Sequence, residues 1–168
     1  AQNKCIEVAY FGINGEPVLH KDGWARAIYE YDSRGNNVKS AYFGVYDERV
    51  LTPKGYHSVK RRYNDQGKIA EESYFYVDDS LVASTDGAAR LVQQYDPFGR
   101  LTEQKLFDAK GAPTVLAGED FHRVLNRYDN SGHIIDKAYF GRDGPILHHD
   151  GYHTIQYKYD NLGNETER

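Results

Sequence analysis

The sequence is poor in cysteine, which cross-links small domains, and in methionine and tryptophan, which help to fill a thick core. It contains one cysteine, Cys5, so an internal disulfide and a cysteine-based metal site are both excluded. It has no methionine and one tryptophan, but 15 tyrosines and 7 phenylalanines. Tyrosine buries a large ring while its hydroxyl stays at a hydrated edge. This composition favours a thin sheet of one or two layers over a thick globular core.

Long apolar runs and an excess of positive charge are also absent. The mean hydropathy is −0.77, and no apolar stretch approaches the roughly 20 residues of a membrane-spanning helix. The formal net charge is −4 and is spread without blocks. Lys60-Arg61-Arg62 is the only basic triplet, whereas nucleic-acid binding needs a basic stripe. We therefore expect no membrane insertion and no nucleic-acid partner.

Short catalytic motifs are missing as well. The sequence has no Gly-x-Ser-x-Gly, no His-Glu-x-x-His, no phosphate loop and no Gly-x-Gly-x-x-Gly. Aspartate and glutamate are abundant, but their positions follow a repeat, so they are expected to serve turns first. The sequence therefore predicts no enzyme and no cofactor. A hydrolase with an unrecognised carboxylate site ranks as the lowest alternative.

What the chain does have is one phrase repeated five times. Tyr followed by Asp or Asn, two variable residues and Gly starts at Tyr31, Tyr63, Tyr95, Tyr128 and Tyr159, at spacings of 32, 32, 33 and 31 residues. A Tyr-Phe-Gly-like phrase and a mid-unit Gly-aromatic pair keep the same period. Self-similarity at such a period indicates a repeat array. Residues that recur in every unit are then expected to build the unit.

Each Asp-x-x-Gly phrase predicts a tight turn between two antiparallel strands. The Asp or Asn side chain caps the backbone two residues on, and the Gly accepts a positive φ. The flanks alternate as strands do, and Gly or Pro interrupts nearly every window that could form a helix. Because a lone hairpin is marginally stable, the units must stack. We expect the Tyr of Tyr-Asp and the Phe of Tyr-Phe to form the buried spine.

The predicted fold is therefore all-β, with little or no helix. We expect one domain over residues 1–168, a solenoid or continuous twisted sheet of about five stacked hairpin repeats of roughly 32 residues. The expected units span residues 9–40, 41–72, 73–104, 105–137 and 138–168. Both ends cut through a unit, which favours a fragment of a longer array. The alternative is a mature start at Ala1 after signal cleavage.

An aromatic residue follows the mid-unit glycine in most units. These residues are Trp24, Tyr56, Phe121 and Tyr152, and the third unit has Ala88 at this position. They lie on the strand face opposite the Tyr of Tyr-Asp. Exposed rings at regular spacing can stack on sugars or clamp an extended peptide, so these four are the candidate ligand-binding residues. The alternative is a second packing row.

Seven histidines raise the possibility of a metal site. His148, His149 and His153 are the candidate ligands, because neighbouring imidazoles can bind Zn²⁺ or Cu²⁺. The alternative is that they are packing or surface residues. Asp-Gly pairs such as Asp22-Gly23 suggest calcium loops only superficially. Calcium takes about six or more oxygens, and each loop offers one or two carboxylates.

The phrase Tyr29-Glu30-Tyr31-Asp32-Ser33-Arg34-Gly35-Asn36 and its copy at residues 157–164 carry a family resemblance. They resemble the tyrosine–aspartate (YD, or RHS-type) repeat of bacterial surface and toxin proteins, although those repeats are typically shorter. Leu106-Phe107-Asp108-Ala109-Lys110-Gly111 resembles, more loosely, the aromatic-glycine repeats of Gram-positive cell-wall-binding modules. Both resemblances imply secreted or surface-displayed hairpin arrays that act as shells, spacers or binding modules.

The leading hypothesis is a non-catalytic repeat module for binding or scaffolding. We expect it at a bacterial cell surface or in a secreted protein. Its expected partners are a protein or carbohydrate ligand and neighbouring repeats or domains of a parent chain. The alternative function is metal binding through the clustered histidines.

Overall fold

The computed structural model describes residues 3–148, 150–160 and 162–167, and every regular element within them is a β-strand. Ala1 and His149 therefore lie outside the described residues. The strands are β1 (Glu7–Ala9), β2 (Arg26–Tyr31), β3 (Asn37–Phe43), β4 (Ser58–Tyr63), β5 (Ile69–Phe75), β6 (Arg90–Tyr95), β7 (Leu101–Phe107), β8 (Arg123–Tyr128), β9 (Ile134–Gly141), β10 (Gly144–Pro145), β11 (Thr154–Gln156), β12 (Lys158–Tyr159) and β13 (Glu165–Glu167). The predicted all-β class is confirmed. No helix long and apolar enough to cross a membrane occurs in this described part.

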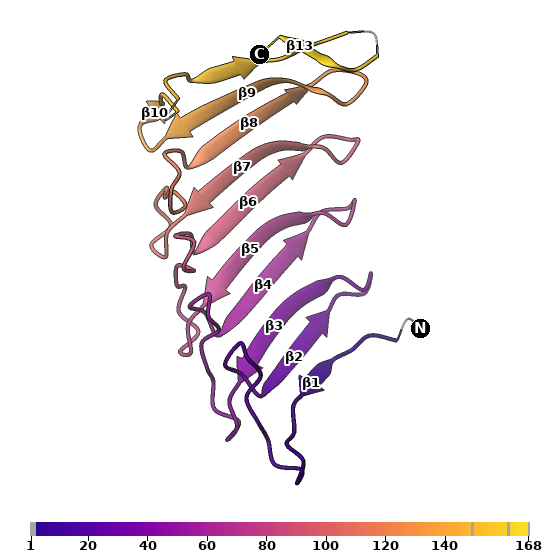
Figure 1. Ribbon diagram of the computed structural model, residues 1–168, viewed down its shortest axis with the longest axis vertical. Helices are drawn as coiled ribbons and strands as arrows, with labels where there is room; N and C mark the ends of the chain where they lie inside the picture. The colour runs from indigo at the N-terminus through magenta and orange to yellow at the C-terminus, as the bar shows by residue number, and fades with distance from the viewer. Residues whose placement is uncertain (1–2, 149, 161, 168) are drawn as a thin grey trace.

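The strands form an open antiparallel sheet in which neighbours in sequence are neighbours in space (Figure 1). Strands β1 to β10 follow chain order, and β11 pairs with β9. The last copy of the turn lies between β12 and β13, which form a separate two-stranded sheet. The fifth unit is therefore split between two sheets, unlike the hairpins before it.

The hairpins β2–β3, β4–β5, β6–β7 and β8–β9 share one register. In β2–β3, Arg26 lies opposite Phe43 and Glu30 opposite Lys39, and the register shifts by one residue at Tyr31. The same shift occurs at Tyr63, Tyr95 and Tyr128. Successive hairpins then meet through three residue pairs each. The predicted hairpins and the sequence period thus coincide over these eight strands.

The Asp-x-x-Gly phrase forms the same turn in each copy. Asp32 Oδ1 accepts the backbone N–H groups of Arg34 and Asn36, both at 2.9 Å, and Gly35 has a φ of 85°. The other copies repeat both bonds at 2.8 to 3.0 Å, and their glycines also have positive φ. The predicted turn is confirmed. The Asn64 copy shows that the cap works without a charge.

A longer connection carries the chain from each hairpin to the next by two further tight turns. Between β3 and β4, Gly44 N–H donates to the Glu48 carbonyl at 2.8 Å, and Thr52 N–H to the Tyr56 carbonyl at 2.9 Å. Phe43 bridges Arg49. The connection therefore folds back on itself at the end of the strands opposite the Asp-x-x-Gly turn. We call these two ends the turn end and the connection end.

The core is a thin row near the connection end. Ala27 and Val59 have no exposed surface, Leu106 is 1% exposed and Tyr139 is 4% exposed. Tyr139 and Leu106 take the Tyr position of the Tyr-Phe phrase in this row, whereas the tyrosines at that position in earlier units are half-buried. The expectation that the Tyr of Tyr-Asp and the Phe of Tyr-Phe form the buried spine is wrong, because neither belongs to the buried core and strand alternation turns the Phe to the opposite face.

Candidate functional site

The tyrosine before each turn joins neighbouring hairpins. Its hydroxyl donates to a backbone carbonyl near the start of the preceding hairpin's second strand. The pairs are Tyr31 to Cys5 (2.9 Å), Tyr63 to Asn37 (3.0 Å), Tyr95 to Ile69 (3.1 Å), Tyr128 to Leu101 (2.8 Å) and Tyr159 to Ile134 (3.0 Å). Burial raises the pKa of Tyr95 and of Tyr128, so both hydroxyls stay donors at neutral pH. We call this set of bonds the tyrosine ladder.

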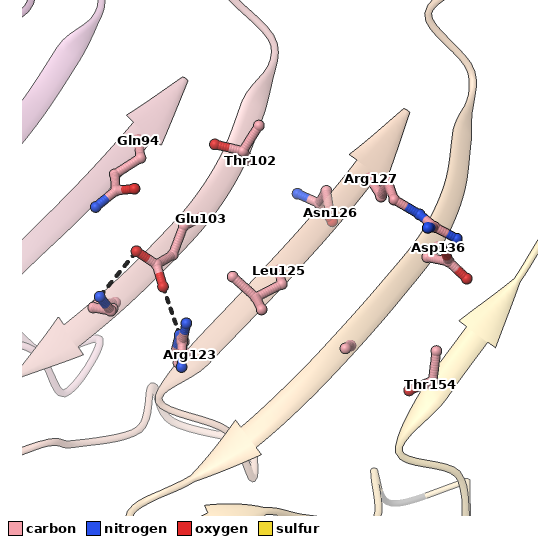
Figure 2. A pocket seen from close by; sticks show the side chains of 11 residues that line it. Gln94, Thr102, Glu103, Arg123, Leu125, Asn126, Arg127, Asp136 and Thr154 are labelled. Atoms are coloured by element: carbon pink, nitrogen blue, oxygen red, sulfur yellow. Dashed lines mark hydrogen bonds and ion pairs between the residues drawn. The ribbon is translucent and has the colours of Figure 1, made fainter. Parts of the chain in front are cut away.

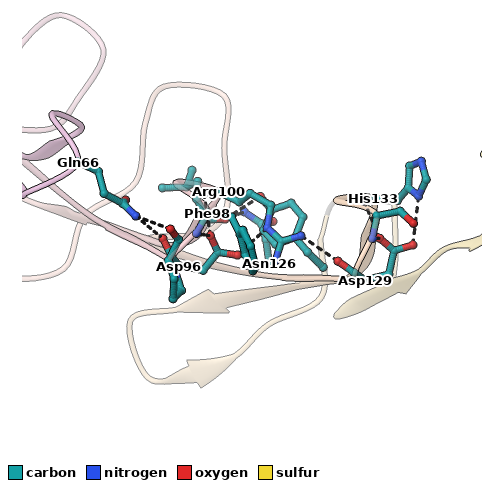
Figure 3. A network of polar contacts seen from close by, with 11 residues as sticks. Gln66, Asp96, Phe98, Arg100, Asn126, Asp129 and His133 are labelled. Carbon is teal, nitrogen blue, oxygen red and sulfur yellow. Dashed lines mark hydrogen bonds and ion pairs between the residues drawn. The ribbon is translucent and has the colours of Figure 1, made fainter.

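Adjacent turns also touch one another (Figure 3). Gln66 Nε2 donates to the carbonyl of Asp96 at 3.0 Å. Arg100 Nε pairs with Asp96 at 2.6 Å, and Arg100 Nη1 donates to the Asp129 carbonyl at 2.8 Å. His133 continues the series by stacking on the ring of Tyr159, with centroids 4.5 Å apart. The turn end is thus held by directional bonds from one unit to the next.

The pKa of Asp96 reflects these bonds. Desolvation acts to raise it, but hydrogen bonds from the backbone N–H and guanidinium of Arg100 outweigh that effect, so the pKa lies below its usual value. Asp129 has a lowered pKa for the same reason, with His133 as its partner. These carboxylates are ionised caps at neutral pH and are poorly suited to act as general acids.

The four predicted ligand-binding aromatics lie in a row of packed rings at the connection end. Trp24 is 8% exposed and packs at 5.5 Å from Tyr42. Tyr56 stacks on Tyr74 with centroids 4.8 Å apart. The rings of Trp24 and Tyr56 therefore pack on the tyrosines of neighbouring strands.

The row continues after a gap at the third unit. Ala88 and Leu106 replace its rings there, and both are buried. Beyond the gap, Phe121 and Tyr152 pack at 4.9 and 6.2 Å from Tyr139. Tyr56, Phe121 and Tyr152 are half-buried, whereas Trp24 is buried. Ligand binding by these residues stays a prediction.

The histidines of the metal hypothesis have separate surroundings. His148 stacks on Tyr152 at 5.0 Å, and its Nδ1 accepts the backbone N–H of Asp150 at 3.4 Å. His153 lies edge-on against Phe140 at 5.2 Å. His149 lies outside the described residues. Within the described ranges, no group of three or more His, Cys, Asp or Glu side chains is placed to hold a metal ion.

The opposite face of the sheet carries charge. A cation lies over the Phe of four of the five Tyr-Phe-like phrases, with ring distances of 4.5 to 4.9 Å; the pairs are Arg26–Phe43, Lys60–Phe75, Arg90–Phe107 and Arg123–Phe140. In the second unit the residue opposite Phe75 is Ser58, and Lys60 supplies the cation from two residues further on. Sequence reasoning missed these pairs because they depend on cross-strand register.

A shallow hollow of about 820 Å³ lies on this charged face, over β6 to β9 and β11 (Figure 2). Leu125 and Ala138 line it between ion pairs. Glu103, only 7% exposed, pairs with Arg123 at 2.6 Å and Lys105 at 2.9 Å. Burial acts to raise the pKa of Glu103, but the hydrogen bonds from Lys105 and Arg123 lower it overall. The carboxylate is therefore ionised and neutralised, a state that suits packing rather than acid catalysis.

Comparisons with known proteins give no family. No family model matches the chain, and no curated protein matches it. Among solved structures, a TcdB2-TccC3-Cdc42 crystal structure is similar over 83% of this chain at 14% identity and a TM-score of 0.34. The Photorhabdus luminescens Tc holotoxin pore is similar over 83% at 13% identity and a TM-score of 0.32. This chain covers 7% and 6% of those chains. TM-scores of this size do not establish a shared fold.

Proposed function

We propose that this chain is a non-catalytic scaffold module, a stretch of hairpin repeats that forms one wall of a larger secreted or surface-displayed protein. The observation that carries the proposal is the tyrosine ladder, in which each recurring Tyr spends its hydroxyl on the backbone of the unit before it. The recurring tyrosine therefore has a structural role in each unit, which is to join that unit to the one before it.

The other recurring residues are used in the same way. The Asp or Asn of each phrase caps its own turn, and the Gly supplies the positive φ. Contacts between units run between neighbours along the array, as in linear repeat proteins whose stability is a sum of unit and interface contributions. Adding a unit lengthens such an array without requiring a new hydrophobic core, and this property is useful in a protein that forms a wall or a spacer.

A binding function at the connection end is the second candidate. The part-exposed rings of Tyr56, Phe121 and Tyr152 favour it, because aromatic edges at regular spacing can hold a carbohydrate or an extended peptide. The third unit, with its buried Ala88, would divide this surface into two. A module that scaffolds and binds would use its two ends for the two tasks.

Deletion of one unit tests the scaffold proposal. Removing residues 73–104 joins equivalent positions of neighbouring units, so the shortened chain should keep its β-sheet circular dichroism and unfold cooperatively. Removing residues 73–88 is the matched control, because it puts the remaining strands out of phase and should abolish the sheet. A chain that loses its fold equally in both deletions would contradict the proposal.

Binding to glycan and peptide arrays separates the second candidate. If a ligand binds saturably, and a Tyr56→Ala/Tyr152→Ala variant loses that binding with an unchanged melting curve, the connection end is a binding site. If the original chain binds no ligand on either array and the variant melts at a lower temperature, the rings serve packing alone.

A further inference from the structure

One buried residue stands at the junction where each connection enters the next hairpin. At His57, the backbone N–H donates to the Phe75 carbonyl at 2.8 Å, and the carbonyl accepts from Tyr42 N–H at 3.1 Å. A single residue thus links β3, β4 and β5. Ala25, Ala89 and His122 make the same two bonds in their own units, at 2.8 to 3.0 Å. The backbone of the junction is constant while its side chain alternates between methyl and imidazole.

The imidazole is buried and incompletely satisfied. His57 is 3% exposed and lies edge-on to Phe43 at 5.3 Å. The Nδ1 atoms of His57, His122 and His153 are buried without a hydrogen-bond partner in the described chain, and the His153 carbonyl accepts the Tyr139 N–H at 3.1 Å as a junction residue does. Such an Nδ1 nitrogen is tolerable as an unused lone pair, but a proton on it would be a buried donor and a buried charge without an acceptor.

The groups around the two imidazoles give little compensation. Desolvation is the largest influence and lowers the pKa of both histidines. Backbone carbonyls of Tyr42 and Val50 oppose it at His57, and that of Gly141 opposes it at His122.

Charged neighbours face both sites. At His57 they are Arg49, which lowers the pKa, and Asp79, which raises it, and these two pair with each other at 2.8 Å. At His122 they are Arg123, Lys105 and Arg142, and all three lower the pKa. Arg123 and Lys105 in turn pair with Glu103 at 2.6 and 2.9 Å.

The junction at Ala25 keeps a space of the same kind. A hollow of about 200 Å³ beside Ala25 is lined by Phe11, Pro17 and Asp47. These residues stand 32 positions before Phe43, Arg49 and Asp79, which surround His57. The fold therefore leaves room at Ala25 for the ring that His57 supplies one unit later.

We propose that His57 and His122 make their junctions sensitive to weak acid, so that the array opens between β3 and β4 and between β7 and β8 while the junctions at Ala25 and Ala89 stay closed. The Nδ1 atoms of both rings are buried in the closed junction, so a proton on Nδ1 gains a water acceptor when the junction separates. Opening between β3 and β4 breaks the Tyr42–His57 backbone bond, whereas the His57–Phe75 bond lies within the next hairpin. One proton therefore weakens the link between two units.

Weak acid destabilises the closed junction because the closed and opened forms bind different numbers of protons. The unfolded or opened chain has ordinary histidines with a pKa of about 6.5, and the closed junction holds the proton less tightly. The opened form therefore binds more protons, and the stability of the closed form is complete above that pH and falls as pH drops below it.

Thermal unfolding of the full chain between about pH 7.5 and 5 tests the proposal, in a range above most carboxylate titrations. A His57→Ala/His122→Ala variant should lose at least roughly half of the acid-induced fall in melting temperature seen in the original chain. It should fold, since alanine is the native residue at two junctions. Ala25→His should add to the fall by introducing a further sensitive junction. Ala25→Leu, which fills the same hollow without a titratable group, is the control and should leave the fall nearly unchanged.

A direct titration keeps the test independent of folding of the variants. In NMR spectra of the unaltered chain, the ring signals of His57 and His122 should titrate below the ordinary histidine pKa of about 6.5. The proposal is overturned if these rings titrate at or above that value, or if the double alanine variant keeps the full acid-induced fall.

Discussion

The two ends of each hairpin are held by different forces. At the turn end, every copy makes the same side-chain to backbone bonds, from the Asp or Asn cap to the tyrosine hydroxyl. At the connection end, rings and small residues replace one another from unit to unit, as Trp24, Ala88 and Phe121 do. Directional bonds demand one residue type at one position, whereas packing accepts different residues if the volume is filled. The Tyr-Asp-x-x-Gly phrase that recurs within the chain therefore marks the contact between neighbouring units. The positions that vary between copies are those where one unit can differ from another in packing and stability.

The largest effect should come from the connection end of the hairpin β6–β7. Leu106 is 1% exposed and stands where other units have a ring, so Leu106→Ala leaves a cavity that no neighbouring ring fills. We expect a loss of about 2–5 kcal/mol in the free energy of unfolding, measured by urea denaturation. Leu106→Tyr restores the residue of the other units and is the matched comparison. It should cost less than the alanine, and an equal cost would contradict the packing account.

The second-largest loss of stability should come from straining the backbone of the turn between β6 and β7. Gly99 has a φ of 78°, which a β-branched residue adopts only with strain, so Gly99→Val should cost about 1–3 kcal/mol. An added Cβ meets mainly the flexible end of Lys68, at 3.3 Å, so the strain is in the backbone. Gly163→Val, in the separate two-stranded sheet, should lower the melting temperature less. Equal losses at the two sites would show that the array does not couple through its centre.

The cap of the same turn should have a smaller effect and a pH signature. Asp96→Ala removes the acceptor for two backbone N–H groups and should lower the melting temperature at neutral pH, whereas Asp96→Asn should resemble the native Asn64 turn. Because the pKa of Asp96 is lowered in the folded chain, its stabilising effect is present above about pH 4 and is lost as pH falls through the folded value. The melting temperature of Asp96→Asn should therefore fall less between pH 5 and 3 than that of the original chain. A parallel fall would contradict this assignment.

The sequence predicted the turn end more completely than the connection end. The caps and the glycine φ angles involve residues within four positions of one another, so a local motif is sufficient to predict them. The acceptor of Tyr95 is Ile69, 26 residues away, and the bulge at Tyr95 aims the ring at it. No local pattern contains that information. The partners of Phe43 and the hollow above Leu125 also depend on cross-strand register.

Two features of the fold differ from what the sequence predicted: the composition of the buried row and the arrangement of the fifth unit. The sequence placed Phe43 and its equivalents in the buried spine, but strand alternation turns them to the sheet face opposite Tyr42 and Tyr74. The split of the fifth unit into β11 and the β12–β13 pair was not foreseen, because its turn phrase is as complete as the others. Its turn forms equally well there, so the phrase specifies a turn and not membership of the main sheet.

The most direct test of the tyrosine ladder removes one hydroxyl and no packing. Tyr95→Phe should cost about 0.5–1.5 kcal/mol and should raise native-state hydrogen exchange of amides in β5 and β6, which the Tyr95–Ile69 bond joins. Tyr42→Phe, a hydroxyl removal at the connection end, is the control and should leave exchange in β5 and β6 unchanged. Faster exchange in Tyr95→Phe alone is the predicted result. Unchanged exchange there, or an equal rise in the control, would contradict the claim that the turn end couples the units.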